Sequence, residues 1–419
     1  MHDSAMHMTG STRGAFEIRI CPNAVLGMGI FLALVFVSYL GRNGVLVFLL
    51  LGMAMQVRRL DLAWRDIRSY WWVCLLPVWA TVSFLWSDHA SLSLRHGTQL
   101  LITFVIAITL ANRLSPLLLL QMLFSALLVA GVASVLIGEV RPDGIWIGIF
   151  DSKNYYAFTM VALVLCSFAF MIDKSQTPLW RMAGVVGAAL GLPQIFMAES
   201  IGAMIAAICV LIAAVALLRI RALPPERQAP RIFSLCMWIG GAVLVMWYFS
   251  EPAFELMFDL TGKDATLTGR TDLWAVALAE IAKAPLSGGG YRAFWVEGNA
   301  AAEMLWAEFY IGSKSGFNFH NLYLSNAVEI GLVGVAAQIA LLASGFILCI
   351  RWLLRSGGAA PLFFFMVVSF VIVLSFVEVP VFFEFDTLSV MTLASVIYGL
   401  RASRELPSFY TPKQAGWTA

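Results

Sequence analysis

The chain has 419 residues, of which 60% are hydrophobic and only 12% are charged, and its mean hydropathy is +0.84. A soluble domain carries about 25% charged residues, so this composition excludes an ordinary soluble globular protein. The 27 basic residues nearly balance the 25 acidic ones, so the net charge gives no indication of a nucleic-acid partner. We therefore predict one all-α, polytopic membrane domain.

Twelve apolar runs are long enough to cross the roughly 30 Å hydrocarbon core of a membrane. They are residues 23–41, 43–57, 70–86, 97–111, 115–138, 155–172, 180–197, 201–219, 232–250, 319–350, 361–378 and 382–400. An even number of crossings places both chain ends on one side, and the loops of that side hold about twice as many Lys and Arg residues. Because short basic loops resist translocation, we predict an inner-membrane protein with both termini in the cytoplasm.

This topology divides the chain into two tails, two groups of spans and one large outer loop. The predicted parts are a cytoplasmic tail (1–22), nine spans (23–250), a periplasmic loop (251–318), three spans (319–400) and a cytoplasmic tail (401–419). Within the loop, Thr271 to Lys283 and residues 301–312 have apolar positions at helical spacing, which predicts two short helices. The loop is the one stretch long and polar enough to form a structure of its own.

Charged residues are nearly absent from the predicted spans, where only Glu329 lies well inside an apolar run. A proton-coupled or ion-coupled transporter usually buries several ionisable groups near the membrane midplane. Here the polar residues gather at the predicted outer face instead: Asp88, His89, Arg95, His96, Arg141, Asp151, Lys153, Asn154, Arg270, Asp272, Tyr291, Arg292, His320 and Asn321. Arginine suits an anionic diphosphate, and a histidine suits proton removal from a sugar hydroxyl. The pattern indicates a site for a lipid-linked diphosphate sugar.

Each of these features also has a structural interpretation. Arg95 and Arg141 can extend to lipid phosphates, and the two histidines in residues 89–96 can be incidental interface residues. The Gly288–Gly290 run favours a flexible turn over a phosphate-binding loop. Glu329 favours a hydrogen-bonded structural acid over a proton carrier.

Four ordered motifs resemble those of the O-antigen polymerase and ligase superfamily, of the Wzy and WaaL types. Residues 268–274 (TGRTDLW) and 284–291 (APLSGGGY) are similar to its arginine motif, and residues 319–334 (FHNLYLSNAVEIGLVG) are similar to its histidine motif. Residues 84–88 (FLWSD) and 148–154 (GIFDSKN) resemble stretches of ExoQ-type exopolysaccharide polymerases.

The resemblance implies a metal-independent C-type glycosyltransferase of the bacterial inner membrane, with its active site on the periplasmic face. It implies that His320 activates the acceptor hydroxyl and that Arg270 binds the diphosphate of the donor. The further candidates for substrate binding are Arg95, Arg141, Lys153, Asn154, Tyr291, Arg292 and Asn321. We expect no cofactor and no metal site, because the outer loop lacks a carboxylate cluster of the kind that holds Mg or Mn.

The implied reaction is transfer of a growing glycan from undecaprenyl diphosphate to a lipid-linked repeat unit, as in a polysaccharide polymerase. An O-antigen ligase, which transfers the glycan to lipid A-core, is the alternative, and a flippase for lipid-linked oligosaccharides is the non-enzymatic one. The expected partners are the lipid-linked donor and acceptor glycans, membrane lipid and a chain-length regulator.

Overall fold

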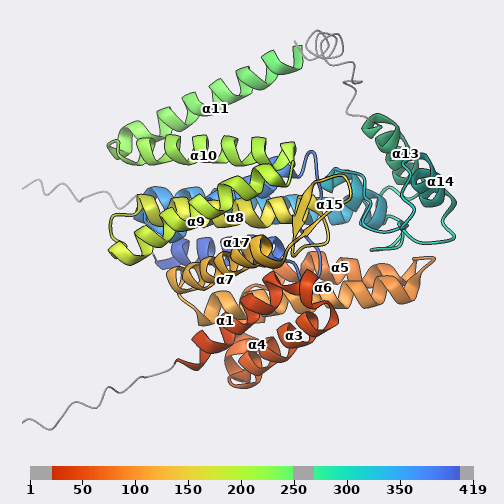
Figure 1. Ribbon diagram of the computed structural model, residues 1–419, viewed down its shortest axis with the longest axis horizontal. Coiled ribbons are helices and arrows are strands. Elements are labelled where there is room, and N and C mark those ends of the chain that lie inside the picture. The colour runs from red at the N-terminus through yellow and green to blue at the C-terminus, as the bar shows by residue number, and fades with distance from the viewer. Residues whose placement is uncertain (1–20, 249–268, 406–419) are drawn as a thin grey trace, which may run out of the picture.

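The computed structural model describes residues 21–248 and 269–405, and these parts of the chain are almost entirely helical (Figure 1). The N-terminal half contains α1 (Pro22–Val35), α2 (Val37–Leu40), α3 (Arg42–Val57), α4 (Leu60–Ser69), η1 (Trp71–Cys74), α5 (Leu75–Val82), η2 (Ser83–Leu85), α6 (Ala90–Arg113) and α7 (Pro116–Ile137). A hairpin of β1 (Glu139–Val140) and β2 (Trp146–Gly148) follows. The remaining helices are α8 (Lys153–Ile172), α9 (Pro178–Met197), α10 (Ile201–Arg221), α11 (Pro225–Tyr248), α13 (Arg270–Lys283), α14 (Ala300–Glu308), α15 (Leu322–Ser356), α16 (Ala359–Leu374) and α17 (Thr387–Glu405).

Six of the described helices are long and apolar enough to cross a membrane, namely α6, α7, α8, α9, α10 and α15. Four further apolar segments are shorter, namely α1, α3, Trp71–Leu85 and α16. The predicted all-helical membrane fold is confirmed, and every predicted span has helical residues at its position. The number of twelve crossings remains a prediction. Residues 1–20, 249–268 and 406–419, which hold most of both predicted tails and the start of the predicted periplasmic loop, lie outside the described residues.

Local sequence explains where several helices begin. Pro116 occupies the first position of α7, where no N–H is needed, and the Ser115 hydroxyl accepts a hydrogen bond from the backbone of the first turn. Ser152 caps α8 in the same way, which fixes Lys153 and Asn154 in the first turn of that helix. The Ser152 cap thus marks the end of the segment that contains the β1–β2 hairpin.

The last two predicted spans differ in their bounds from the helices that form. The sequence predicts spans at 361–378 and 382–400, but α16 ends at Leu374 and α17 begins at Thr387. Between them, residues 375–386 form a loop that contains Pro380, which has no N–H for a helical hydrogen bond. The α17 helix also continues to Glu405, into the predicted C-terminal tail. The 375–386 loop will prove central to the candidate site.

Loops that the sequence places on the cytoplasmic side contact one another. The contacts are Arg113 with Asp66 at 2.6 Å, Arg401 with the Ala111 carbonyl at 2.6 Å, Asp173 with the Ala359 N–H at 2.8 Å and Arg221 with the Ser356 carbonyl at 3.1 Å. The opposite end of the bundle carries α13 and α14, which lie beside the start of α15 (Figure 1). Alternating membrane crossings require such a separation of the loops, and the assignment of one end to the cytoplasm is still a prediction.

The long helix α15 is broken at Gly331, where φ is 66° and ψ is −178°. The segment 285–290 lies against this break and supplies most of the missing hydrogen bonds. The bonds are Gly289 N to Val328 O at 2.9 Å, Gly290 N to Glu329 O at 2.8 Å, Leu332 N to Pro285 O at 2.9 Å and Trp79 Nε1 to Ile330 O at 2.8 Å. The expected turn after Pro285 is present, and it is packed against α15, so two N–H groups of the glycine run are not free to bind phosphate.

The helices α13 and α14 share a small apolar core with the start of α15. Its buried members are Leu273, Ala277, Phe294, Ala302, Leu305, Trp306, Phe319 and Val328. The Trp274 indole donates to the Phe319 carbonyl at 2.8 Å, which ties α13 to the residue before His320. Both helices predicted in the outer loop are confirmed, although α14 ends at Glu308 rather than near residue 312.

Candidate functional site

The side chains of Arg270 and His320 meet on one carboxylate, that of Glu378 in the 375–386 loop. Glu378 Oε2 lies 2.9 Å from His320 Nδ1, and Glu378 Oε1 lies 3.4 Å from Arg270 Nη2. The Glu378 side chain is 10% exposed, whereas those of Arg270 and His320 are 24% and 27% exposed. A buried carboxylate thus holds a permanent cation and an imidazole that both remain accessible.

The turn before α15 fixes the position of His320. Its backbone has φ of 46°, an uncommon conformation for a residue with a side chain, and its N–H donates to Asn318 Oδ1 at 2.7 Å. The next residue, Asn321, caps α15 by accepting from backbone N–H groups of the first turn, and its Nδ2 donates to the Phe376 carbonyl at 3.2 Å. Because these bonds occupy the Asn321 amide, this side chain holds the histidine turn against the 375–386 loop.

The contact with Glu378 also favours one tautomer of the neutral His320 ring. A carboxylate beside Nδ1 accepts the proton of that nitrogen, so a neutral ring keeps its lone pair on Nε2. A base whose second nitrogen is held by a carboxylate is an arrangement that suits general-base catalysis.

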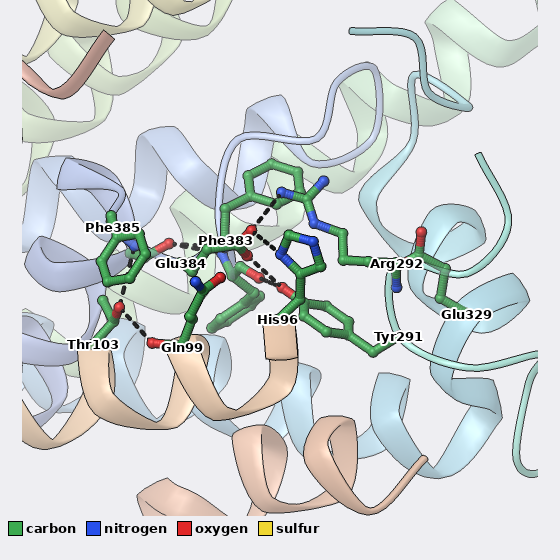
Figure 2. A network of polar contacts seen from close by, with 11 residues as sticks. His96, Gln99, Thr103, Tyr291, Arg292, Glu329, Phe383, Glu384 and Phe385 are labelled. Atoms are coloured by element: carbon green, nitrogen blue, oxygen red, sulfur yellow. Dashed lines mark hydrogen bonds and ion pairs between the residues drawn. The ribbon is translucent and has the colours of Figure 1, made fainter. Parts of the chain in front are cut away.

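A second charged centre forms around Glu384 in the same loop (Figure 2). Glu384 Oε1 lies 2.7 Å from His96 Nδ1 and 3.2 Å from Arg292 Nη2. The Tyr291 hydroxyl donates to the Phe382 carbonyl at 2.9 Å and lies 3.3 Å from Glu384 Oε2. His96 is therefore part of a network of polar contacts, rather than the incidental interface residue that the sequence favours.

The surroundings of Glu384 keep its carboxylate ionised. Burial alone would raise its pKa, but the Arg292 guanidinium and the hydrogen-bonded His96 ring hold the pKa of Glu384 at about 2. Burial raises the pKa of Tyr291 well above its usual value, so its phenol stays neutral. With only 2% of its surface exposed, Tyr291 braces the loop and does not face a cavity in this conformation.

Glu329 joins this centre to the break in α15. Its carboxylate accepts a hydrogen bond from the backbone N–H of Arg292 at 3.0 Å. Arg292 has φ of 60°, so this contact holds a left-handed backbone residue in place. The interpretation of Glu329 as a hydrogen-bonded structural acid is confirmed.

A cavity of about 520 Å³ lies beside both centres, and its size falls within the range of about 300–1,000 Å³ that is usual for ligand sites. Its wall includes His96, Arg292 and Glu329 from the second centre. It also includes Phe317, Asn318 and Val379, which are neighbours in sequence of His320 and Glu378. We call it the loop cavity.

Another cavity, of about 610 Å³, lies on the other side of the glycine run. Asp88 and His89, two of the predicted outer-face residues, line it together with Lys283. Neither cavity is lined by Arg270, His320 or Glu378. The loop cavity is the better candidate for chemistry, although it is slightly smaller, because its wall includes sequence neighbours of His320 and Glu378.

Four candidate residues from the sequence are not part of either centre, although Arg95 directly precedes His96 in the chain. They are Arg95 in α6, Arg141 in the β1–β2 hairpin, and Lys153 and Asn154 at the start of α8. Arg141 forms an exposed ion pair with Asp143 at 3.0 Å, and Asn154 Oδ1 accepts from the Ser200 hydroxyl at 3.0 Å. Within the described residues, none of the four forms a hydrogen bond or ion pair with either loop glutamate. Arg292, in contrast, lines the loop cavity.

Neither loop glutamate was expected from the sequence, because both fall at the edges of apolar runs. The stretch SFVEVPVFFEFD at residues 375–386 contains three carboxylates and a proline between two strongly apolar segments. A carboxylate so close to the membrane interior is costly unless it has a partner, which is the signal that could have identified them.

Comparison with known proteins adds two findings. A family model described as Wzy_C, O-antigen ligase, matches residues 186–339, a range that includes Arg270 and His320 but not Glu378. The exopolysaccharide production protein ExoQ of Rhizobium meliloti (strain 1021) is 30% identical over 283 residues, which are 66% of this chain and 65% of that protein. The match thus spans slightly less than two thirds of the relative's length.

Proposed function

We propose that this chain, which matches the Wzy_C O-antigen ligase model, is a membrane glycosyltransferase. More specifically, we propose that it is a polysaccharide polymerase. It transfers a growing glycan from undecaprenyl diphosphate to a lipid-linked repeat unit at the periplasmic face of the inner membrane. The observation that carries this proposal is the meeting of Arg270 and His320 on Glu378. Such a site offers a base for a hydroxyl and a cation for a phosphate within one small volume.

In the proposed reaction, a hydroxyl of the acceptor sugar gives its proton to Nε2 of His320 as its oxygen attacks the anomeric carbon of the donor. The bond between that carbon and the diphosphate oxygen breaks on the opposite side, so the configuration inverts. Undecaprenyl diphosphate leaves with the bonding electron pair, and the Arg270 guanidinium stabilises the negative charge that develops on it.

Glu378 has two roles in this scheme. It keeps the His320 ring in the orientation that exposes Nε2, and it stabilises the imidazolium that forms when the proton is transferred. The contact between Glu378 and Arg270 is longer, at 3.4 Å, and involves a single guanidinium nitrogen. Within the described residues it is the only hydrogen bond that this guanidinium forms. The guanidinium has five N–H donors, so most of them remain available to a diphosphate.

Two observations bear on the choice between polymerase and ligase. The relative that covers two thirds of this chain is named for exopolysaccharide production, which favours a polymerase here. The matching family model is described as O-antigen ligase, which makes transfer to lipid A-core the second candidate. The two reactions share the donor and the proposed chemistry, and they differ in the acceptor.

The test is incubation of purified protein with undecaprenyl diphosphate-linked repeat units alone. A ladder of lipid-linked products identifies a polymerase, and product that forms only when lipid A-core is added identifies a ligase. Movement of the lipid-linked glycan across a vesicle membrane without a new glycosidic bond would contradict both and indicate a flippase.

Substitutions link the activity to the site. We expect Arg270→Ala and His320→Ala each to lower the transfer rate at least about 100-fold at unchanged membrane abundance. Matched controls are Arg181→Ala and His89→Ala, which change the same residue types away from Glu378 and should leave the rate within about twofold. Unchanged product length and yield from both site variants would disprove the proposed roles.

A further inference from the structure

The side chains of His96 and Arg292 meet on one oxygen of Glu384, and both line the loop cavity. Glu384 Oε1 lies 2.7 Å from His96 Nδ1 and 3.2 Å from Arg292 Nη2. Because both groups contact the same oxygen, the imidazole and the guanidinium lie side by side. Their side chains are 23% and 36% exposed, so a ligand in the cavity can reach them.

Each of these two side chains has a nitrogen atom that Glu384 does not contact. Within the described residues, neither His96 Nε2 nor Arg292 Nη1 forms a hydrogen bond (Figure 2). Neither atom is among the buried unpaired atoms, in contrast to Arg292 Nε, which is. The two outer nitrogens are therefore available to a ligand in the cavity.

The Arg292 guanidinium is held in place before any ligand binds. Its Cζ lies 4.6 Å from the centre of the Phe383 ring, which also lines the cavity. The backbone N–H of the same residue donates to the Glu329 carboxylate at 3.0 Å. A guanidinium that is fixed at one face, at one edge and at its backbone loses little freedom on binding, which favours affinity.

The charges in the cavity wall favour a ligand with one negative charge. The wall contains the cations Arg292 and Lys314 and one carboxylate, that of Glu329. Lys314 lies 3.9 Å from Glu303, an exposed pair of little strength whose carboxylate does not line this cavity. A ring that already donates to Glu384 can donate through Nε2 as well when it is an imidazolium. One carboxylate of a ligand, together with Glu384, then balances Arg292 and His96, whereas a diphosphate brings more negative charge than this wall can neutralise.

Aromatic rings in the same wall suit a sugar as the carrier of that charge. The rings of Trp295 and Phe317 lie 5.2 Å apart in an edge-to-face arrangement, and both residues line the cavity. A sugar has apolar C–H faces that pack on aromatic rings, and polar groups around its rim.

We propose that the loop cavity is a subsite for an acidic group of the substrate glycan, a carboxylate or a singly charged phosphate substituent, which binds to Arg292 Nη1 and His96 Nε2. This assignment rests on the proposed transferase function, because that function supplies the glycan. The subsite is separate from Arg270, to which we assign the lipid diphosphate, and it makes the protein selective for an acidic repeat unit.

Binding is tested without turnover, with two sugars that differ in one group. The probes are methyl glucuronide, which carries a carboxylate, and methyl glucoside, which has a hydroxymethyl group in its place. Their Kd values for the purified full-length protein in a non-ionic detergent are measured by saturation-transfer NMR. We expect the glucuronide to bind at least about tenfold more tightly than the glucoside, because only the carboxylate forms charge-assisted hydrogen bonds.

Substitutions locate the binding in this cavity. We expect Arg292→Gln and His96→Gln each to raise the Kd of the glucuronide about tenfold and to leave that of the glucoside unchanged. The matched control is His89→Gln, in the wall of the other cavity, which should leave both Kd values unchanged.

Lys314→Gln keeps the test decisive if the first two variants fail to fold. Its side chain is 45% exposed and forms no contact with Glu384, so the variant leaves that network intact. We expect the Kd of the glucuronide to rise about threefold, since an exposed charge contributes less than a partly buried one. The matched control is Lys283→Gln, a lysine that does not line this cavity.

Three results would overturn the assignment. They are equal Kd values for the two probes, no change in the Kd of the glucuronide in any folded variant, and displacement of the glucuronide by undecaprenyl diphosphate from Arg270→Ala protein. The last result would mean that the cavity holds the lipid diphosphate and not a group of the glycan. Absence of transfer by the wild-type protein would contradict the proposed function alone, because the Kd values still decide whether this cavity binds an acidic sugar.

Discussion

Glu378 and Glu384 lie on the same loop between α16 and α17, and each carboxylate is paired with one histidine and one arginine. The pairs are Glu378 with His320 and Arg270, and Glu384 with His96 and Arg292. One loop near the C-terminus therefore contacts side chains from α6, from α13, from the residues after the glycine run and from the turn before α15. A change in either glutamate should separate catalytic effects from effects on stability, because only Glu378 contacts the proposed base.

Glu378→Gln should lower kcat about 100-fold to 1,000-fold and change KM for the donor by less than about fivefold. The amide keeps the size of the side chain but removes the negative charge that orients His320 and stabilises its imidazolium. Initial rates with lipid-linked repeat units measure both constants. Glu405→Gln, at a side chain that is 71% exposed at the end of α17, is the matched control and should behave as wild type. A Glu378→Gln enzyme with normal kcat would show that the carboxylate has no part in the reaction.

Glu384 should make the fold sensitive to acid. Its pKa of about 2 in the folded protein lies below the ordinary 4.5, so its contribution to stability is complete above about pH 4.5 and is lost as the pH falls towards 2. At 1.36 kcal/mol for each pKa unit, that contribution amounts to about 3 kcal/mol. We expect Glu384→Gln to lower the Tm at pH 7 and to flatten the fall in Tm between pH 5 and pH 2.5, measured by thermal unfolding in detergent. Parallel Tm curves for the two proteins would contradict this role.

Asp386 should have the opposite effect on the pH dependence of stability, making the fold less stable as the pH rises. Burial raises its pKa from 3.8 to about 6 in the folded protein, against the hydrogen bond that it accepts from the Ser389 N–H at 2.6 Å. A raised pKa means that its contribution to stability is present below about pH 4 and is lost as the pH rises through 6.

Asp386→Asn keeps an acceptor for Ser389 and removes the charge. We expect this variant to be more stable than wild type by up to about 3 kcal/mol at pH 7.5 and nearly equal to it at pH 4. The same thermal unfolding assay measures both values. A variant that is less stable at pH 7.5 would mean that the carboxylate charge at this position stabilises the fold.

The sequence was sufficient to locate the helices but not the partners of the charged groups. Apolar runs give the position of each helix because the lipid requires about 20 apolar residues per crossing. They extend the last two spans into the 375–386 loop, because the apolar residues of that loop pack inside the protein: Val381, Phe382 and Phe385 are buried there. An apolar run reports burial, and burial by protein cannot be distinguished from burial by lipid without the fold.

The site was predictable only in part for a related reason. Resemblance to a family singled out Arg270 and His320, which stand in recognisable motifs. Their common partner is separated from them by 108 and 58 positions along the chain, and the partner of His96 by 288 positions. No periodicity or spacing encodes such contacts, because tertiary packing creates them.

The break in α15 offers a test of how the scaffold supports both centres. Gly331 has φ of 66°, and a Cβ at this position would collide with the backbone of Leu286 and Ser287. Gly331→Ala should therefore strain the backbone by about 1–3 kcal/mol and push the 285–290 segment away from α15. We expect a lower Tm and loss of activity, since that segment precedes Arg292. The matched control is Gly240→Ala in α11, where a Cβ meets nothing within 4 Å and should be neutral or slightly stabilising. Equal Tm values for Gly331→Ala and Gly240→Ala would show that the contact between the glycine run and the broken helix does not hold the site together.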